Sequence, residues 1–315
     1  MKINRTSRCL LVFLCASLLT SACSAPAART QPVVPTQTQT LVGSPTPPAA
    51  TAEPLASPTE ARVSTEARLT DADAALQFGD YPAALQAYAA GKSSGSAALR
   101  AAGLFGQGLV NFKLGDYFQA KPFLLELIST YTDSLPAARA NYLLARIAVS
   151  EKNYSDAVNY LTAYQQARPG VLDAFIFEQI GDLRAQTGEH DLALKAYSSA
   201  YLASDPNDNA ALAIKVGIEY MELGQNEQAS AIYRDVYART ADIYLKSQLD
   251  LLLGRASIAQ GAVEEGFAYY QHAVNNYPET YDAYSAVLAL LDAEQSVDEL
   301  QRGLINYFRG QYDLA

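Results

Sequence analysis

Two histidines and three cysteines are the side chains of this 315-residue sequence that could most readily act as a base, a nucleophile or a metal ligand. His190 follows a Gly-Glu pair and His272 lies in a tyrosine-rich stretch, and neither has a ligand or triad partner at a useful spacing. All three cysteines fall within the first 23 residues, so the rest of the chain has no thiol. The sequence therefore predicts two surface or groove histidines, no metal site and no cofactor.

Motifs that would carry catalysis or nucleic-acid binding are also missing. No G-x-S-x-G, Walker or dinucleotide-binding pattern occurs, and paired acids such as Asp71 with Asp73 are expected on solvated helix faces. The formal charge of −10 disfavours nucleic acid as a partner, because phosphates require clustered lysine and arginine. We therefore expect a protein without catalytic residues that does not bind nucleic acid.

The first 22 residues have the pattern of a secretory signal peptide. Residues 1–8 are basic, and the apolar residues 9–19 would form a helix of only about 16 Å, roughly half the hydrocarbon core of a bilayer. The segment Leu19-Thr20-Ser21-Ala22-Cys23 resembles the lipobox of bacterial lipoproteins, which implies that Cys23 is lipidated and becomes the new N-terminus. Ordinary signal cleavage nearby, with Cys23 incidental, is the alternative.

Residues 23–60 are dominated by Pro, Thr, Ala, Gln and Ser, with few large apolar side chains. Such a segment cannot bury enough surface to offset its ordering entropy, and its prolines favour extended conformations. We expect a lipidated, disordered tether that holds residues 61–315 away from the outer face of a bacterial membrane.

From residue 65 a unit recurs every 36 or 37 residues, which is typical of helical repeats. Each unit has a short turn between two helices, and glycine suits the left-handed residue that ends a helix. Prolines such as Pro169, Pro206 and Pro278 follow the second helices and prevent their continuation. The six turns are Gly79-Asp80-Tyr81, Gly115-Asp116-Tyr117, Lys152-Asn153-Tyr154, Gly188-Glu189-His190, Gly224-Gln225-Asn226 and Gly261-Ala262-Val263.

Small residues stand at fixed places around each turn, where they would let the two antiparallel helices of one hairpin approach closely. A large residue on each second helix is expected to fill the space between adjacent hairpins. The small residues seven places before each turn are Ala72, Gly108, Ala145, Gly181, Gly217 and Gly254. The large residues are Tyr88, Leu124, Leu161, Tyr197, Tyr233 and Tyr270.

This pattern resembles the tetratricopeptide repeat (TPR) over residues 65–279. The resemblance implies an all-α, right-handed superhelical solenoid of TPR-like helical hairpins, whose first helices line a concave, protein-binding face. The plan of signal, tether and superhelix is also similar to the N-terminal part of bacterial soluble lytic transglycosylases. No Glu-Ser pair of their catalytic domain occurs, so by that likeness the chain would be a non-catalytic arm.

The repeat spacing breaks after Pro278, since the next turn is Gly310-Gln311-Tyr312. We expect an inserted helix near Tyr281 to Ala293, and then the first helix of an incomplete seventh unit from Val297 to Arg309. Solenoids normally end in a capping element with a polar outer face. The expectation is a truncated product, with a surface supplied by a partner as the alternative.

The phase of the repeats predicts which first-helix residues line the concave groove. Aromatic side chains with arginines that make bidentate contacts could hold an extended peptide or a segment of anionic cell-wall polymer. Ordinary core packing and a polar rim would explain the same residues. The predicted groove residues are Phe105, Phe112, Arg139, Tyr142, Arg146, Phe175 and Arg255.

Two functions remain open from the sequence. The first is a cell-envelope scaffold, anchored by Cys23, whose groove binds a protein or peptide. The second is the substrate-handling arm of a peptidoglycan-cleaving protein whose catalytic domain is absent from this chain.

Overall fold

The computed structural model describes residues 64–315, so the predicted signal, Cys23 and tether lie outside the described residues. Within residues 64–315 every regular element is helical, and there is no strand. The helices are α1 (Thr65–Gln77), α2 (Tyr81–Lys92), α3 (Ala97–Lys113), α4 (Tyr117–Thr130), α5 (Leu135–Ser150), α6 (Tyr154–Ala167), α7 (Asp173–Gln186), α8 (His190–Ala203), α9 (Ala210–Glu222), α10 (Asn226–Arg239), α11 (Ile243–Ala259), α12 (Val263–Asn276), α13 (Tyr281–Asp292) and α14 (Glu299–Phe308).

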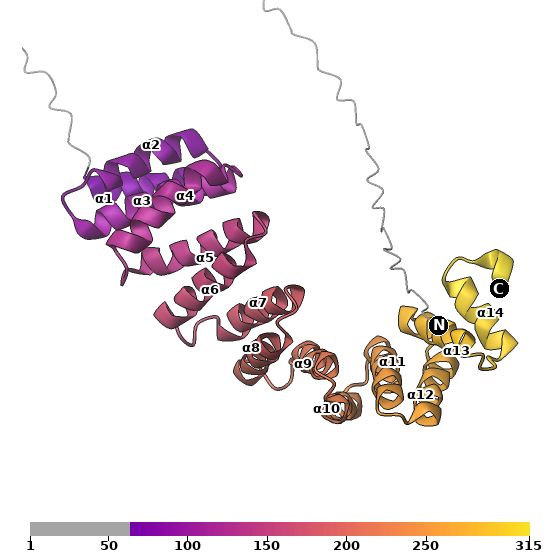
Figure 1. Cartoon of the computed structure of the whole chain (residues 1–315). Coiled ribbons are helices and arrows are strands. Elements are labelled where there is room, and N and C mark those ends of the chain that lie inside the picture. Colours follow the sequence, from indigo (N-terminus) through magenta and orange to yellow (C-terminus); the bar gives the residue numbers. More distant parts are fainter. Residues whose placement is uncertain (1–63) are drawn as a thin grey trace, which may run out of the picture. The chain divides into compact units, whose positions relative to one another are not determined.

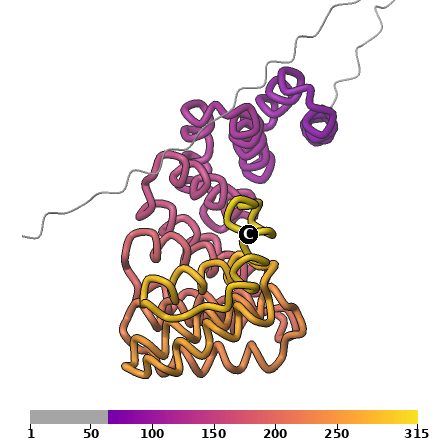
Figure 2. The backbone as a smooth tube through the Cα atoms, turned by 90° about the vertical axis from the view of Figure 1, so that its right-hand side faces the viewer, coloured from indigo at the N-terminus to yellow at the C-terminus, as the bar shows by residue number. Residues whose placement is uncertain are grey.

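Each helix packs against the next one along the chain, which forms six hairpins from α1–α2 to α11–α12 (Figure 1). First helices of neighbouring units also touch, as α1 does with α3 and α3 with α5. Figure 2 shows the last hairpins side by side. The predicted all-α array of helical hairpins is confirmed. None of the helices within residues 64–315 combines the length and apolar character that crossing a bilayer requires.

The turns within the six hairpins share one backbone conformation. At Gly79 φ is +78°, and the Asp80 N–H donates to the Ala75 carbonyl, which satisfies an orphan carbonyl at the helix end. Gly115, Gly188, Gly224 and Gly261 repeat this left-handed conformation with φ between +73° and +86°. Lys152 adopts it as well, at φ +60°, although a side chain disfavours it.

The residue after this position caps the second helix in only half of the hairpins. Oδ1 of Asp80, Asp116 and Asn153 accepts a hydrogen bond from the backbone N–H three residues further on, at 3.1, 3.0 and 3.3 Å. Glu189, Gln225 and Ala262 make no such bond. The same turn therefore has a side-chain cap in the first three hairpins and none in the last three.

The large residues of the second helices pack within their own hairpin as well as against the next one. A Cβ added at Gly181, Gly217 or Gly254 would meet the tyrosine ring of the same hairpin at 2.2–2.5 Å. These glycines therefore make room for a ring within the hairpin, rather than only letting two backbones approach. The prediction that the large residue fills the space between adjacent hairpins also holds. Tyr88 lies against Gly106 of the next hairpin, and Tyr233 shares a core cluster with leucines of α11.

The inserted helix and the next first helix are present beyond the sixth hairpin. Helix α13 begins at the predicted Tyr281, and Thr280 caps it by accepting from the Ala283 N–H at 3.1 Å. Helix α14 begins at Glu299, two residues after the predicted start, because Asp298 acts as its N-cap. Gly310 then takes the same left-handed turn, at φ +72°.

Candidate functional site

The centre of the predicted groove is an aromatic cluster on first helices α5 and α7. The Tyr142 ring lies 6.4 Å from the Phe175 ring and 6.0 Å from the Tyr164 ring of α6, measured between centroids. Arg146 Nη1 donates to Tyr142 Oη at 3.5 Å. Phe175 is 45% exposed, and Arg139 and Arg146 are exposed on α5. Aromatic surface and two guanidinium groups therefore face solvent together.

The other predicted groove residues lie elsewhere. Phe105 and Phe112 of α3 are half-buried against the core formed by α3, α4 and α5, and Phe112 packs on Tyr117 with 5.5 Å between the ring centroids. Arg255 is exposed on α11, where its charge opposes the burial-driven rise in the pKa of Tyr270 and Asp282. The structure thus brings Tyr142, Arg146 and Phe175 together and gives Phe105 and Phe112 packing roles.

An ion-pair network that the sequence analysis missed links first helices α7 and α9. Lys215 Nζ lies 2.8 Å from Glu178 Oε1 and 2.6 Å from Asp182 Oδ1. Burial lowers the pKa of Lys215, but these two carboxylates outweigh it and the pKa is raised. Lys215 stands 37 residues after Glu178, so the repeat period was the signal that could have found this pair.

Both histidines have acidic hydrogen-bond partners that their sequence spacing did not indicate. His190 Nδ1 lies 2.8 Å from Glu219 Oε2, and His272 Nδ1 lies 2.7 Å from Asp250 Oδ2. Each acid is buried on a first helix, with Glu219 4% and Asp250 2% exposed. The sequence separations are 29 and 22 residues, so no local spacing rule would connect the partners.

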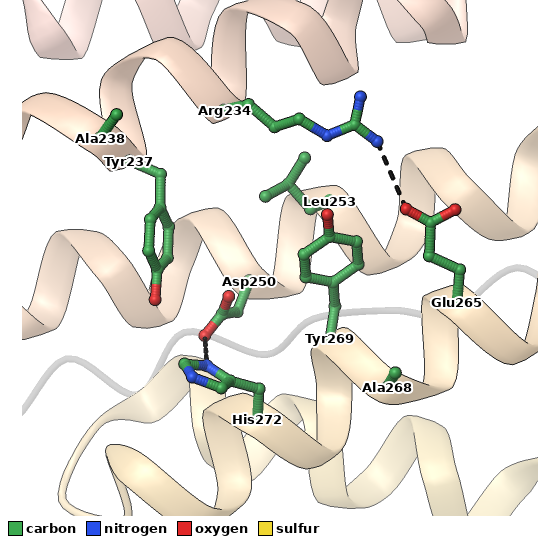
Figure 3. Close-up of a pocket in the computed structure, with 9 residues that line it drawn as sticks. All are labelled: Arg234, Tyr237, Ala238, Asp250, Leu253, Glu265, Ala268, Tyr269 and His272. Carbon is green, nitrogen blue, oxygen red and sulfur yellow. Dashed lines mark hydrogen bonds and ion pairs between the residues drawn. The ribbon is translucent and has the colours of Figure 1, made fainter.

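Asp250 and His272 lie in a cleft of about 420 Å³ between α10, α11 and α12 (Figure 3). The rings of Tyr237 and Tyr269 stand on either side of Asp250 in this view. At the far end, Arg234 Nη2 lies 3.3 Å from Glu265 Oε1. The cleft, which we call the α10–α12 cleft, therefore combines aromatic walls with a buried carboxylate.

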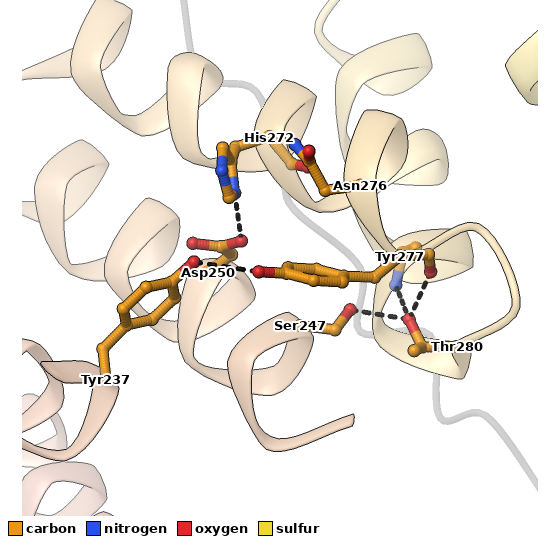
Figure 4. A network of polar contacts seen from close by, with 8 residues as sticks. Tyr237, Ser247, Asp250, His272, Asn276, Tyr277 and Thr280 are labelled. Carbon is orange, nitrogen blue, oxygen red and sulfur yellow. Dashed lines mark hydrogen bonds and ion pairs between the residues drawn. The ribbon is translucent and has the colours of Figure 1, made fainter. Parts of the chain in front are cut away.

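A polar network adjoins this cleft at the C-terminal end of α12 (Figure 4). The hydroxyls of Tyr237 and Tyr277 are 3.1 Å apart, and the Tyr277 ring packs edge-on against His272 with centroids 5.8 Å apart. Burial raises the pKa of the Asp250 carboxyl, and His272 and Lys246 only partly offset this. Asp250 is thus a buried acid for which the effect of burial outweighs that of its positive neighbours.

Metal-binding geometry is not seen in the described part of the chain. No three His, Cys, Asp or Glu side chains within residues 64–315 group as metal ligands would.

The sequence matches two models of repeat families. Residues 91–218 match a tetratricopeptide repeat-like domain, and residues 214–280 match a tetratricopeptide repeat. Together these matches span more than half of the 315 residues. No curated protein matches the chain.

Solved structures that resemble the chain include a crystal structure of MamA, with 14% identity over 62% of this chain and 96% of that one, at a TM-score of 0.45. PilF of Pseudomonas aeruginosa matches at 14% identity over 73% and 97%, with a TM-score of 0.43. PilW, a type IV pilus biogenesis factor, matches at 16% identity over 71% and 98%, with a TM-score of 0.42. At these values the structures do not bear on what this chain binds.

None of these descriptions names a lytic transglycosylase, so the likeness to that layout stays a prediction. The repeat period, the left-handed turns, the consecutive packing of the hairpins and the two family matches agree with one another. The chain belongs to the tetratricopeptide repeat proteins.

Proposed function

We propose that this chain is a non-catalytic scaffold that binds a protein or peptide on the face formed by its first helices. The observation that carries the proposal is the solvent-facing cluster of Tyr142 and Phe175, with Arg139 and Arg146 exposed beside it. Aromatic rings supply contact area at low entropic cost, and arginine can bind a carboxylate or a backbone carbonyl through several N–H groups. An extended acidic or aromatic segment would suit this surface.

Site-specific photocrosslinking tests this assignment. A photoreactive phenylalanine analogue placed at Phe175 should yield one discrete adduct in the producing cell, identified by mass spectrometry. The matched control is the same analogue at Phe118, which is 81% exposed on the second helix α4. The adduct at 175 should disappear in the double variant Arg139→Ala, Arg146→Ala, whose melting temperature should change little because both side chains are exposed. Equal adducts at both positions would contradict the proposal.

We also propose that the scaffold is exported and held at a membrane by a lipid on Cys23, with residues 23–60 as its tether. The support for this is the basic and apolar signal pattern followed by the lipobox-like segment. Several acyl chains on one residue, at about 0.8 kcal/mol per buried methylene, would anchor the chain firmly. Metabolic labelling with a palmitate analogue should mark the wild type and not Cys23→Ala, and a labelled variant would remove the anchor.

A further inference from the structure

The α10–α12 cleft has a counterpart one repeat earlier, between α8, α9 and α10. Both clefts have a volume of about 420 Å³, and their lining residues stand 36 or 37 positions apart in the sequence. Tyr201 corresponds to Tyr237, and Val216 corresponds to Leu253. The same cavity thus occurs in two successive units, and its chemistry depends on the side chains that each unit places in it.

The side chains at the corresponding positions differ sharply between the two clefts. At three corresponding places the α8–α10 cleft has an alanine, an isoleucine and an aspartate, whereas the α10–α12 cleft has a buried acid, a second tyrosine and a histidine. The corresponding pairs are Ala213 and Asp250, Ile232 and Tyr269, and Asp235 and His272.

The buried carboxylate of Asp250 is the group in this cleft with which a cation would pair. From α12, His272 occupies Oδ2 of the carboxylate, and from α11 Lys246 contributes positive charge. These groups leave the effect of burial incompletely offset. Arg234, the arginine of the lining, is already paired with Glu265, so the lining carries no uncommitted guanidinium for an anion.

The tyrosine rings suit the same ligand. Lys246 Nζ lies 5.4 Å from the centroid of the Tyr237 ring, so this ring already accepts an ammonium group of the protein. Lys246 does not line the cleft, in which Tyr237 and Tyr269 flank Asp250 (Figure 3). Aromatic faces next to a carboxylate are the arrangement that recognises organic cations.

We propose that the α10–α12 cleft binds an aliphatic ammonium or guanidinium group, carried by a lysine or arginine side chain of a partner or by a free amine. The apolar walls take the methylene stem, and Asp250 pairs with the charged head. The net charge of −10 attracts such ligands at long range. This site is separate from the predicted groove, since the groove residue Arg255 and the cleft residue Leu253 lie about 160° apart around α11. The proposal therefore does not rest on the proposed function.

Saturation-transfer difference NMR on the full chain at low salt tests the site. The probes are capped Ala-X-Ala tripeptides in which X is lysine, arginine, norleucine or glutamate, together with 1,5-diaminopentane. The lysine and arginine peptides should bind saturably, and the norleucine and glutamate peptides should not. Tighter binding of the peptides than of the diamine assigns a polypeptide as the source of the cation, and the reverse assigns a free amine.

Variants place the binding at Asp250. Asp250→Asn keeps an acceptor for His272 and should lower the affinity for the lysine peptide about tenfold or more. Tyr269→Ile introduces the residue found at the corresponding place of the α8–α10 cleft and should lower this affinity roughly threefold to tenfold. Asp235→Asn makes the same change of charge in the α8–α10 cleft and should leave binding unaltered.

Circular dichroism melting curves check that each variant is folded. If Asp250→Asn does not fold, Tyr269→Ile still tests the site. Three results would overturn the proposal. They are equal binding of the norleucine and lysine peptides, preferential binding of the glutamate peptide, and unchanged binding in folded Asp250→Asn and Tyr269→Ile.

Discussion

The third hairpin (α5–α6) and the fifth (α9–α10) share a backbone but differ in the residues at its key positions. The third pairs Ala145 with Leu161 in one core cluster, whereas the fifth pairs Gly217 with the fully buried ring of Tyr233. In the fifth hairpin the ring fills the space that the absent Cβ of Gly217 leaves. This match is not a rule for the whole array, since in the second hairpin Gly108 leaves the same space to the leucine Leu124.

The turns of the same two hairpins differ in backbone strain and in side-chain capping. The third hairpin has Lys152 in the left-handed conformation but a side-chain cap from Asn153. The fifth has the unstrained Gly224 but no cap from Gln225. Each hairpin thus lacks one favourable feature that the other has, and exchanging single residues between them tests these assignments.

The largest effect is expected for Gly217→Ala. The added Cβ would lie 2.3 Å from Cε1 of Tyr233, which is 0% exposed and cannot move aside, so we expect a loss of about 2–3 kcal/mol in the free energy of unfolding. Urea unfolding measures this loss. Adding Tyr233→Leu recreates the pair of the third hairpin, so the double variant should be more stable than the sum of the single changes. Additive losses would disprove the coupling.

Alkaline pH should destabilise the fifth hairpin next most strongly. Burial raises the pKa of Tyr233 above its ordinary value of about 10, with Arg255 opposing it. The contribution of neutral Tyr233 to stability is therefore complete below about pH 10 and is lost as the pH rises toward the raised pKa. In urea unfolding, the free energy of unfolding should fall less between pH 8 and pH 10.5 for Tyr233→Phe than for the wild type.

The phenylalanine variant should be nearly as stable as the wild type at pH 8, because the Tyr233 hydroxyl has only the Met221 sulfur as a partner, at 3.6 Å. Tyr88 provides the contrast, since its hydroxyl donates to Asp73 at 2.5 Å. Tyr88→Phe should therefore lose stability already at pH 8. Equal losses in the two variants would show that the hydroxyl partners are irrelevant.

Replacing Lys152 by glycine should stabilise the protein by about 1 kcal/mol. The left-handed φ of +60° is unfavourable for a residue with a Cβ, and Lys152 is exposed, so little packing is lost. The matched change Gly224→Ala should cost a similar amount, because φ is +73° there and nothing lies near an added Cβ. Thermal melts of both variants check the sign, and a stabilising Gly224→Ala would contradict this account.

The smallest expected effects concern the caps. Asn153→Ala should destabilise by about 1 kcal/mol, since it removes the acceptor for the Asp156 N–H. Gln225→Asp should stabilise by about 0.5 kcal/mol, because it supplies a cap that the fifth hairpin lacks. Chemical unfolding of the two variants gives both values. A turn in which both changes are neutral would mean that water caps these helices equally well.

Much of the fold could be predicted because its signals are local. A residue with positive φ, a capping side chain and a proline after the second helix each act within a few residues, and their 36- or 37-residue period identified even the turn at Lys152, which has no glycine. The inserted helix α13 was found through a break in this period. Phase also placed Tyr142 and Phe175 on neighbouring first helices that touch.

The candidate sites were predicted only in part, because contacts between helices depend on side-chain direction and length. Phase alone could not distinguish the exposed Phe175 from the half-buried Phe105 and Phe112. Nor could it show that His272 would reach Asp250, since the two lie on different helices and are not related by the repeat. The cleft they share required the positions of three helices at once.

The repeat period, the helices, their turns and the class of protein could thus be predicted from the residues alone, because short-range backbone preferences repeated six times leave few alternatives. The residues alone do not tell which glycine accommodates which ring, which acid pairs with each histidine, or which of two corresponding clefts has a buried acid that pairs with a histidine. These outcomes depend on packing between side chains distant in sequence, where displacements of an ångström or two select the partner.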